Sequence, residues 1–479
     1  MKRTAFAISL ATLPLADIAS AQSVTDETAA VDIDDLRFGY APVPAAAPGF
    51  DPAADARALV APGTSSSARA PIPGRQYLGS YAAGQRYVIR VPRAWNGSLV
   101  CCGTPATRSE FANDLIWSDF LLARGYAVAS SNKGIEQNVV IEPLAAMTES
   151  HAVYPVPFDT GGSETTRRGY RFGMLGARRV PIERWNDDFA SLVGFSQRLL
   201  AERHRARPRR TFVVGLSNGG AQVRTILERY PDSVDGGVDW SGVFWDPERS
   251  LLDTLPAFLL GMPEYIKRGY RDHEIERELT AAGFPTDVRQ TDPAHPSLWS
   301  EYYSNQPSFY ADVTVWAYGM LLDPRVHDGY AVDTFVPNAD DPDHLPGTSH
   351  STGFALPSIR ASYTPSRFAR TAIGAFAHTG AIGRPLVSIA GTHDAFTPPE
   401  NHARPYAAAV KLARRANLHE LYLVEGGTHV DAFVPFGYGL RAQLPFAWAA
   451  FDRLVTIVEG RKRANGTTHT VRSPADIAR

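Results

Sequence analysis

The stretch Arg210-Thr-Phe-Val-Val-Gly-Leu-Ser217-Asn-Gly-Gly220 is the most informative part of the chain. A β-branched run leads into the pattern Gly-x-Ser-x-Gly, and a helix is expected next because apolar residues recur with helical spacing from Val223 to Tyr230. A serine at the tip of such a turn must adopt a strained backbone, and Gly215 and Gly219 would relieve the crowding around it. The pattern therefore predicts that Ser217 is a nucleophile at the carboxyl edge of a sheet.

The first residues predict export from a bacterial-type cytoplasm. Lys2 and Arg3 precede an apolar run over residues 5–15, and the small residues Ala19-Ser20-Ala21 follow, which is the layout of a secretory signal. The run is too short to span a bilayer, and no later segment approaches the ~20 consecutive apolar residues that spanning requires. We therefore expect a secreted or periplasmic protein with no membrane contact once the signal is removed.

The overall composition argues against several kinds of partner. The 479 residues carry a net charge of −2, which gives no reason to expect nucleic acid as a partner. The two cysteines, Cys101 and Cys102, are adjacent and would point to opposite faces of a strand, so two buried thiols are expected rather than a disulfide. Asp340, Asp341 and Asp343 lack the spacing of a calcium loop, and no metal site is expected.

Strand-like and helix-like segments alternate on both sides of the serine motif. Strands are expected at 85–91, 98–102, 126–130, 237–240, 385–390 and 419–424, and helices at 110–123 and 185–201. This α/β alternation is typical of a mostly parallel sheet with helices on both faces. It fails between 245 and 375, where aromatic-rich, helix-forming stretches predict an inserted and mainly helical cap.

The two ends of the chain lack a periodic apolar pattern. The first is rich in Ala, Pro, Gly and Ser and is expected to lie along the domain as an extended arm, while the last is polar and is expected to be solvated. The predicted division is a signal peptide at 1–21, the arm at 22–75, a core at 76–244 and 376–460, the cap at 245–375 and a C-terminal tail at 461–479.

Two further residues stand where partners of a catalytic serine would be needed. Asp394 follows the buried strand at 385–390, and His429 follows the strand at 419–424. A serine hydroxyl is a poor nucleophile until a base takes its proton, and His429 is predicted to be that base. Asp394 is predicted to fix the tautomer of the imidazole and to stabilise its protonated form.

Other residues near these motifs compete for the same roles. His393 neighbours Asp394, but adjacent residues of one loop cannot easily face each other across a site. Alternative positions for the acid are Asp431, Glu400 and Asp239.

The reaction also needs two backbone N–H groups that bind the negative charge developing on the carbonyl oxygen. Asn218, which directly follows the nucleophile, is predicted to supply one of them. The other is expected from the loop after the strand at 98–102, where Thr104 is preferred to Gly103. Pro105 has no N–H to offer.

The three motifs at 215–219, 391–394 and 427–429 resemble those of the α/β-hydrolase superfamily, over roughly residues 76–460. The resemblance implies an α/β-hydrolase fold, acyl-enzyme chemistry and no metal or organic cofactor. Within the superfamily, the segments 217–220, 123–128 and 133–134 are similar to secreted 3-hydroxybutyrate oligomer hydrolases. Tannases and feruloyl esterases resemble the chain less, because they carry cysteines where this chain has Leu216 and Val430.

These features together predict a secreted serine hydrolase that cleaves a carboxylic ester, with Ser217, His429 and Asp394 as its triad. Small-molecule or oligomeric esters, aromatic or of the hydroxyalkanoate type, are the expected substrates, because the aromatic residues of the cap would line an apolar pocket. A serine peptidase of the same fold and a non-catalytic binding module on a hydrolase scaffold are the alternatives.

Overall fold

The computed structural model describes residues 29–43, 52–82, 85–106, 108–134, 142–143, 170–171, 181–268, 272–284, 314–315, 318–319, 321–324, 363–436 and 439–478. The predicted signal peptide and most of the aromatic residues of the predicted cap lie outside these ranges. Within them, no helix combines the length and the hydropathy that crossing a bilayer requires.

One large sheet organises the molecule, and within the described residues it has ten strands in the order β1-β2-β3-β5-β4-β8-β9-β10-β11-β12. The pairs from β5 to β12 are parallel, and those that join β1, β2, β3 and β5 are antiparallel. The strands are β1 (Ala29–Ile33), β2 (Gly74–Ala82), β3 (Gln85–Pro92), β4 (Ser98–Gly103), β5 (Ala127–Ser131), β8 (Arg210–Leu216), β9 (Gly236–Trp240), β10 (Leu386–Gly391), β11 (His419–Val424) and β12 (Thr468–Val471). A separate short pair joins β6 (Glu142–Pro143) to β7 (Tyr170–Arg171).

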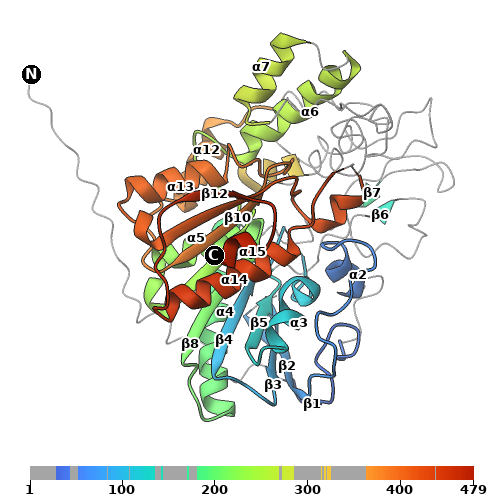
Figure 1. Ribbon diagram of the computed structural model, residues 1–479, viewed down its shortest axis with the longest axis vertical. Coiled ribbons are helices and arrows are strands. Elements are labelled where there is room, and N and C mark those ends of the chain that lie inside the picture. Colours follow the sequence, from blue (N-terminus) through green and yellow to red (C-terminus); the bar gives the residue numbers. More distant parts are fainter. Residues whose placement is uncertain are drawn as a thin grey trace, which may run out of the picture.

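Helices cover both faces of the sheet because alternate strand residues point to opposite sides. Leu99 and Cys101 pack with α4 (Ile182–Arg203), α5 (Asn218–Arg229) and α13 (Ala403–Leu412) in one core. Val100 and Cys102 pack in the other core with the π-helix Asp114–Ser118, α3 (Asp119–Leu122) and α14 (Leu444–Val458). Figure 1 shows these helices flanking the strands. Both cysteines are free and buried.

This architecture confirms the predicted fold class, since a mostly parallel sheet with helices on both faces and a serine turn after a central strand is the α/β-hydrolase fold. The helix predicted at 110–123 differs from the structure: helical residues begin only at Asp114, with a π-helical turn. The side chain of Asn113 bonds to β5, and that of Asp114 bonds to β3. Asn113 Nδ2 donates to Ser130 Oγ at 2.9 Å, and Asp114 pairs with Arg90.

The described parts of the predicted arm and tail contain more regular structure than the sequence predicted. Residues of the predicted arm form β1, which pairs with β2, and α2 (Pro52–Arg57), and they bury Leu36 and Leu59. Most residues of the C-terminal tail are exposed, yet part of the tail forms regular structure. Residues 468–471 form β12 in parallel with β11, and α15 (Ala475–Ala478) buries Ile477 completely.

The described part of the predicted cap is helical. It contains α6 (Leu251–Lys267), α7 (His273–Ala281) and α12 (Arg367–Phe376). In Figure 1, α6 and α7 lie together at one end of the molecule, beyond the layers of the core.

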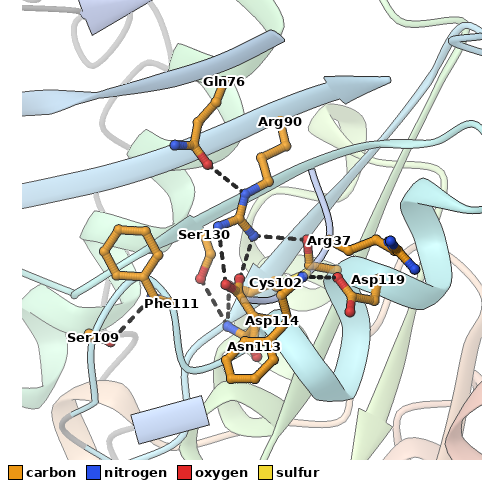
Figure 2. Close-up of polar contacts among 12 residues, drawn as sticks. Arg37, Gln76, Arg90, Cys102, Ser109, Phe111, Asn113, Asp114, Asp119 and Ser130 are labelled. Carbon is orange, nitrogen blue, oxygen red and sulfur yellow. Dashed lines mark hydrogen bonds and ion pairs between the residues drawn. The ribbon is translucent and has the colours of Figure 1, made fainter. Parts of the chain in front are cut away.

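A buried ion pair ties the antiparallel strands to the π-helical turn (Figure 2). Arg90 donates to both carboxylate oxygens of Asp114, at 2.5 and 3.0 Å, and its Nε donates to Gln76 Oε1 at 2.8 Å. Close by, the backbone N–H of Phe38 donates to Asp119 Oδ1 at 2.9 Å, which ties the N-terminal segment to α3.

Candidate active site

Ser217 lies at a strained turn between β8 and α5. Its φ of 59° and ψ of −118° belong to a region that residues other than glycine rarely adopt. The backbone holds this conformation from three directions: its N–H donates to Trp240 O at 2.9 Å, and its carbonyl accepts from Ala221 at 3.0 Å and Val243 at 3.1 Å. The strain predicted for the serine motif is therefore present in the structure.

The two motif glycines stand where no side chain would fit. A Cβ on Gly215 would lie 2.2 Å from the carbonyl oxygen of Gly219. A Cβ on Gly219 would lie 2.1 Å from the carbonyl oxygen of Gly103, the last residue of β4. The glycines thus let the start of α5 pack directly against β8 and against the end of β4.

His429 and Asp394 meet beyond the ends of β11 and β10. His429 Nδ1 donates to Asp394 Oδ2 at 2.8 Å, and both side chains are buried. The other carboxylate oxygen accepts from the backbone of Phe396 at 2.9 Å and Thr397 at 2.8 Å. Burial by itself would raise the pKa of Asp394, but His429 and these hydrogen bonds outweigh it and hold that pKa below its ordinary value.

A threonine that the sequence reasoning missed completes this arrangement. Thr397 Oγ1 donates to Asp394 Oδ2 at 2.7 Å and lies 3.2 Å from His429 Nδ1. The signal was available in the sequence, because Thr397 follows Asp394 by three residues, a spacing at which a hydroxyl in a turn can reach back to a carboxylate.

The competing candidates are engaged elsewhere. Asp239 pairs with Arg224 at 2.6 Å, and Glu400 pairs with Arg404 at 2.5 Å on the surface. Asp431 accepts from the backbone of Gln443 and Leu444, and burial raises the pKa of its carboxyl to about 6. His393 Nδ1 lies 3.0 Å from Thr392 Oγ1.

Ser217, Asn218 and His429 line one pocket. Its wall is mostly apolar and comes from distant parts of the chain, including the N-terminal segment and the cap. The remaining lining residues are Ala58, Leu59, Pro105, Ala106, Arg108, Val243, Leu251, Thr314, Tyr318, Phe396, Thr397, Val430 and Phe433.

Tyr318 brings the cap against the nucleophile turn. Its hydroxyl accepts a hydrogen bond from Asn218 Nδ2, and its ring packs edge-on against Trp185, with 6.0 Å between ring centroids. The Trp245 ring also packs against Tyr318, with 5.6 Å between the ring centroids. Burial raises the pKa of Tyr318, so its hydroxyl stays neutral beside Asn218.

The loop after β4, which is predicted to complete the oxyanion site, is held by polar contacts to β5 and to Asn113. Thr104 Oγ1 donates to Ser131 O at 2.6 Å, and Asn113 Nδ2 lies 3.3 Å from the same hydroxyl. Figure 2 shows Asn113 reaching Ser130 at the end of β5. Asn218 lines the pocket. From the loop after β4, the lining residues are Pro105 and Ala106, and Thr104 directly precedes them in the sequence.

Lys133, two residues after the end of β5, supports the same loop. Its Nζ donates to Ala106 O and lies 4.8 Å from the centroid of the Trp185 ring. Burial is the main reason that the pKa of Lys133 falls to about 7.

Among the described residues, no group of three or more His, Cys, Asp or Glu side chains is placed to hold a metal ion. Asp340, Asp341 and Asp343 lie outside those residues.

Comparisons with known proteins give structural likenesses only. No protein-family model matches the sequence, and no curated protein matches it. Feruloyl esterase B from Aspergillus oryzae is 11% identical, with a TM-score of 0.45 over 92% of this chain and 88% of that one. An esterase from Aspergillus oryzae is 13% identical, with a TM-score of 0.41 over 84% of each chain. A rice cell wall degrading esterase from Xanthomonas oryzae is 14% identical, with a TM-score of 0.44 over 77% of this chain and 88% of that one.

Proposed function

We propose that this chain is a serine hydrolase that cleaves carboxylic esters through an acyl-enzyme. The observation that carries the proposal is the convergence of a strained Ser217 and of His429 on one pocket, with His429 bonded to a buried Asp394. These are the nucleophile, base and orienting acid that acyl transfer requires, and each occupies the end of a different strand.

In the proposed reaction, Ser217 Oγ attacks the carbonyl carbon of the ester while His429 Nε2 takes the hydroxyl proton. Asp394 accepts from Nδ1 and stabilises the imidazolium that forms. The bond from carbon to the alcohol oxygen then breaks, and His429 gives its proton to that oxygen. Water, deprotonated by the same imidazole, attacks the acyl-enzyme and releases the carboxylic acid with Ser217 restored.

Backbone N–H groups would stabilise the oxyanion in both halves of the reaction. Asn218, which follows the nucleophile and lines the pocket, is the proposed donor on one side. The loop that contains Thr104 and Ala106 would supply the second N–H donor, since Lys133 and Asn113 hold this loop beside the nucleophile turn.

The apolar and aromatic wall of the pocket favours esters with an apolar acyl or alcohol part. Aryl esters and hydroxyalkanoate esters are the first substrates to test.

The layout of residues 1–21, which is that of a secretory signal, supports a location of the enzyme outside the cytoplasm.

A fluorophosphonate probe tests the mechanism directly. We expect covalent labelling of the folded protein at Ser217, none in Ser217→Ala, and full labelling in the control Ser233→Ala, which lies in a turn remote from the triad motifs. Folded protein that resists labelling would favour a binding module.

A panel of p-nitrophenyl esters, tested beside aminoacyl anilides, then separates an esterase from a peptidase, because only the peptidase would prefer the anilides.

A further inference from the structure

We propose that Arg108 binds a carboxylate of the substrate, so that the preferred substrate is an ester that also bears an anionic group. The inference rests on the proposed function, because it concerns the same pocket as Ser217 and His429.

Among the described residues that line the pocket, Arg108 is the only lysine or arginine. It lines the pocket with only 12% of its side chain exposed, and no aspartate or glutamate of the described residues lines that pocket. A guanidinium in such apolar surroundings attracts an anion more strongly than it would in water.

The guanidinium of Arg108 also has N–H groups that are not used in its contact with Asp55. Its Nη1 donates to Asp55 Oδ1 at 2.9 Å and lies 3.4 Å from the carbonyl oxygen of Asp55. Its Nε and Nη2 groups bond to none of the described residues. The planar fork can therefore keep its contact with Asp55 and still donate to a carboxylate in the pocket.

Asp55 fixes the arginine and does not compete with a ligand for it. The carboxylate of Asp55 is buried, and its second oxygen accepts from Ser109 N at 2.8 Å and from Ser109 Oγ at 2.5 Å. Asp55 lies in α2, close in sequence to Ala58 and Leu59 of the pocket wall, so the ion pair links this part of the wall to the cation.

Matched esters test the proposal. Monomethyl esters of succinic, adipic and suberic acids would be compared with the corresponding ω-amide methyl esters, which have the same shape without the charge. Acetyl esters of hydroxybutanoic and hydroxyhexanoic acids, with their amides, would place the anion on the alcohol side. Hydrolysis is followed in a pH-stat, and the readout is the ratio of kcat/KM within each pair.

We expect the wild type to prefer the anionic member of at least one pair by about tenfold or more, the effect of a charge-assisted hydrogen bond. Arg108→Gln should bring that ratio near one, and any general effect of the substitution on kcat/KM cancels because the ratio compares two esters on the same variant. Arg108→Lys should retain part of the preference, and Asp55→Asn, which leaves the guanidinium in place, most of it.

The proposal is overturned if the wild type shows no preference in any pair, or if the preference survives in Arg108→Gln. Should Arg108→Gln fail to fold, inhibition of the wild type decides: adipate must inhibit hydrolysis of a neutral ester more strongly than adipamide, and equal inhibition refutes the role of Arg108. A wild type that hydrolyses no ester at all would instead contradict the proposed function.

Discussion

A methyl group on Gly219 would lie 2.1 Å from the carbonyl oxygen of Gly103, so the nucleophile turn and the end of β4 are in backbone contact. We expect Gly219→Ala to displace the end of β4 and the loop that follows it, to lower kcat at least about tenfold and to cost about 1–3 kcal/mol of unfolding free energy, as overpacking does. Urea unfolding and ester hydrolysis would measure the two effects.

Gly374→Ala is the matched control, because a Cβ there meets Pro247 at an ordinary 3.6 Å within α12. Replacing a helical glycine with alanine should raise stability by about 1 kcal/mol and leave turnover unchanged. Equal behaviour of the two variants would contradict the importance of the contact between Gly219 and Gly103.

The hydrogen bond between His429 and Asp394 makes a second prediction. Asp394→Asn should lower kcat by about three to four orders of magnitude, because an amide can no longer stabilise the imidazolium or fix its donating nitrogen. Stopped-flow or steady-state hydrolysis of an activated ester would show it. Glu400→Gln, six residues on and at the surface, should keep wild-type turnover, and an active Asp394→Asn variant would rule out Asp394 as the acid.

Asp119 predicts a dependence of stability on pH. Burial raises its pKa to about 6, against the hydrogen bond from Phe38 N. Between its ordinary value of 3.8 and about 6, the folded state keeps a proton that the unfolded state has released. The free energy of unfolding should therefore fall, by up to about 3 kcal/mol, as the pH rises through that window, and should then level off.

Asp119→Asn removes this titration and retains an oxygen that can accept from Phe38. We expect its unfolding free energy to change less with pH than that of the wild type between about 4 and 6, measured by urea unfolding in matched buffers. Parallel profiles for the two proteins would show that Asp119 ionises normally.

The buried pair of Arg90 and Asp114, shown in Figure 2, can be weighed by a double-mutant cycle. Either Arg90→Met or Asp114→Leu should cost about 3–5 kcal/mol, because each leaves an unpaired charge in the core, and the double variant should cost less than the sum. The exposed pair of Arg75 and Asp32, at 2.8 Å, is the control and should couple by no more than about 1 kcal/mol. Additive losses at the buried pair would contradict the coupling.

The sequence was most predictive where local pattern and tertiary role agree. The central strands β4, β8, β10 and β11 are runs of apolar residues because both of their faces are buried, and this made them recognisable. Gly215 and Gly219 beside the nucleophile were also recognisable in the sequence, because the close backbone contacts at these positions leave no room for a side chain.

What escaped prediction depends on contacts between distant segments. β12 has one buried residue, Val471, after three exposed ones, so its sequence shows no strand pattern although β11 supplies its hydrogen bonds. Arg108 and Leu59 reach the pocket from segments separated by about fifty residues, and no local signal links them. The helix predicted at 110–123 begins only at Asp114 in the structure, because the side chains of Asn113 and Asp114 bond to β5 and β3.

The backbone of Ser217, at φ 59° and ψ −118°, has a consequence beyond the reaction. Such a conformation costs a residue with a side chain about 1–3 kcal/mol, and glycine would be nearly free of that cost. A descendant of this chain released from selection for its chemistry would therefore drift toward glycine at position 217. Its free energy of unfolding would rise as it lost its reactivity.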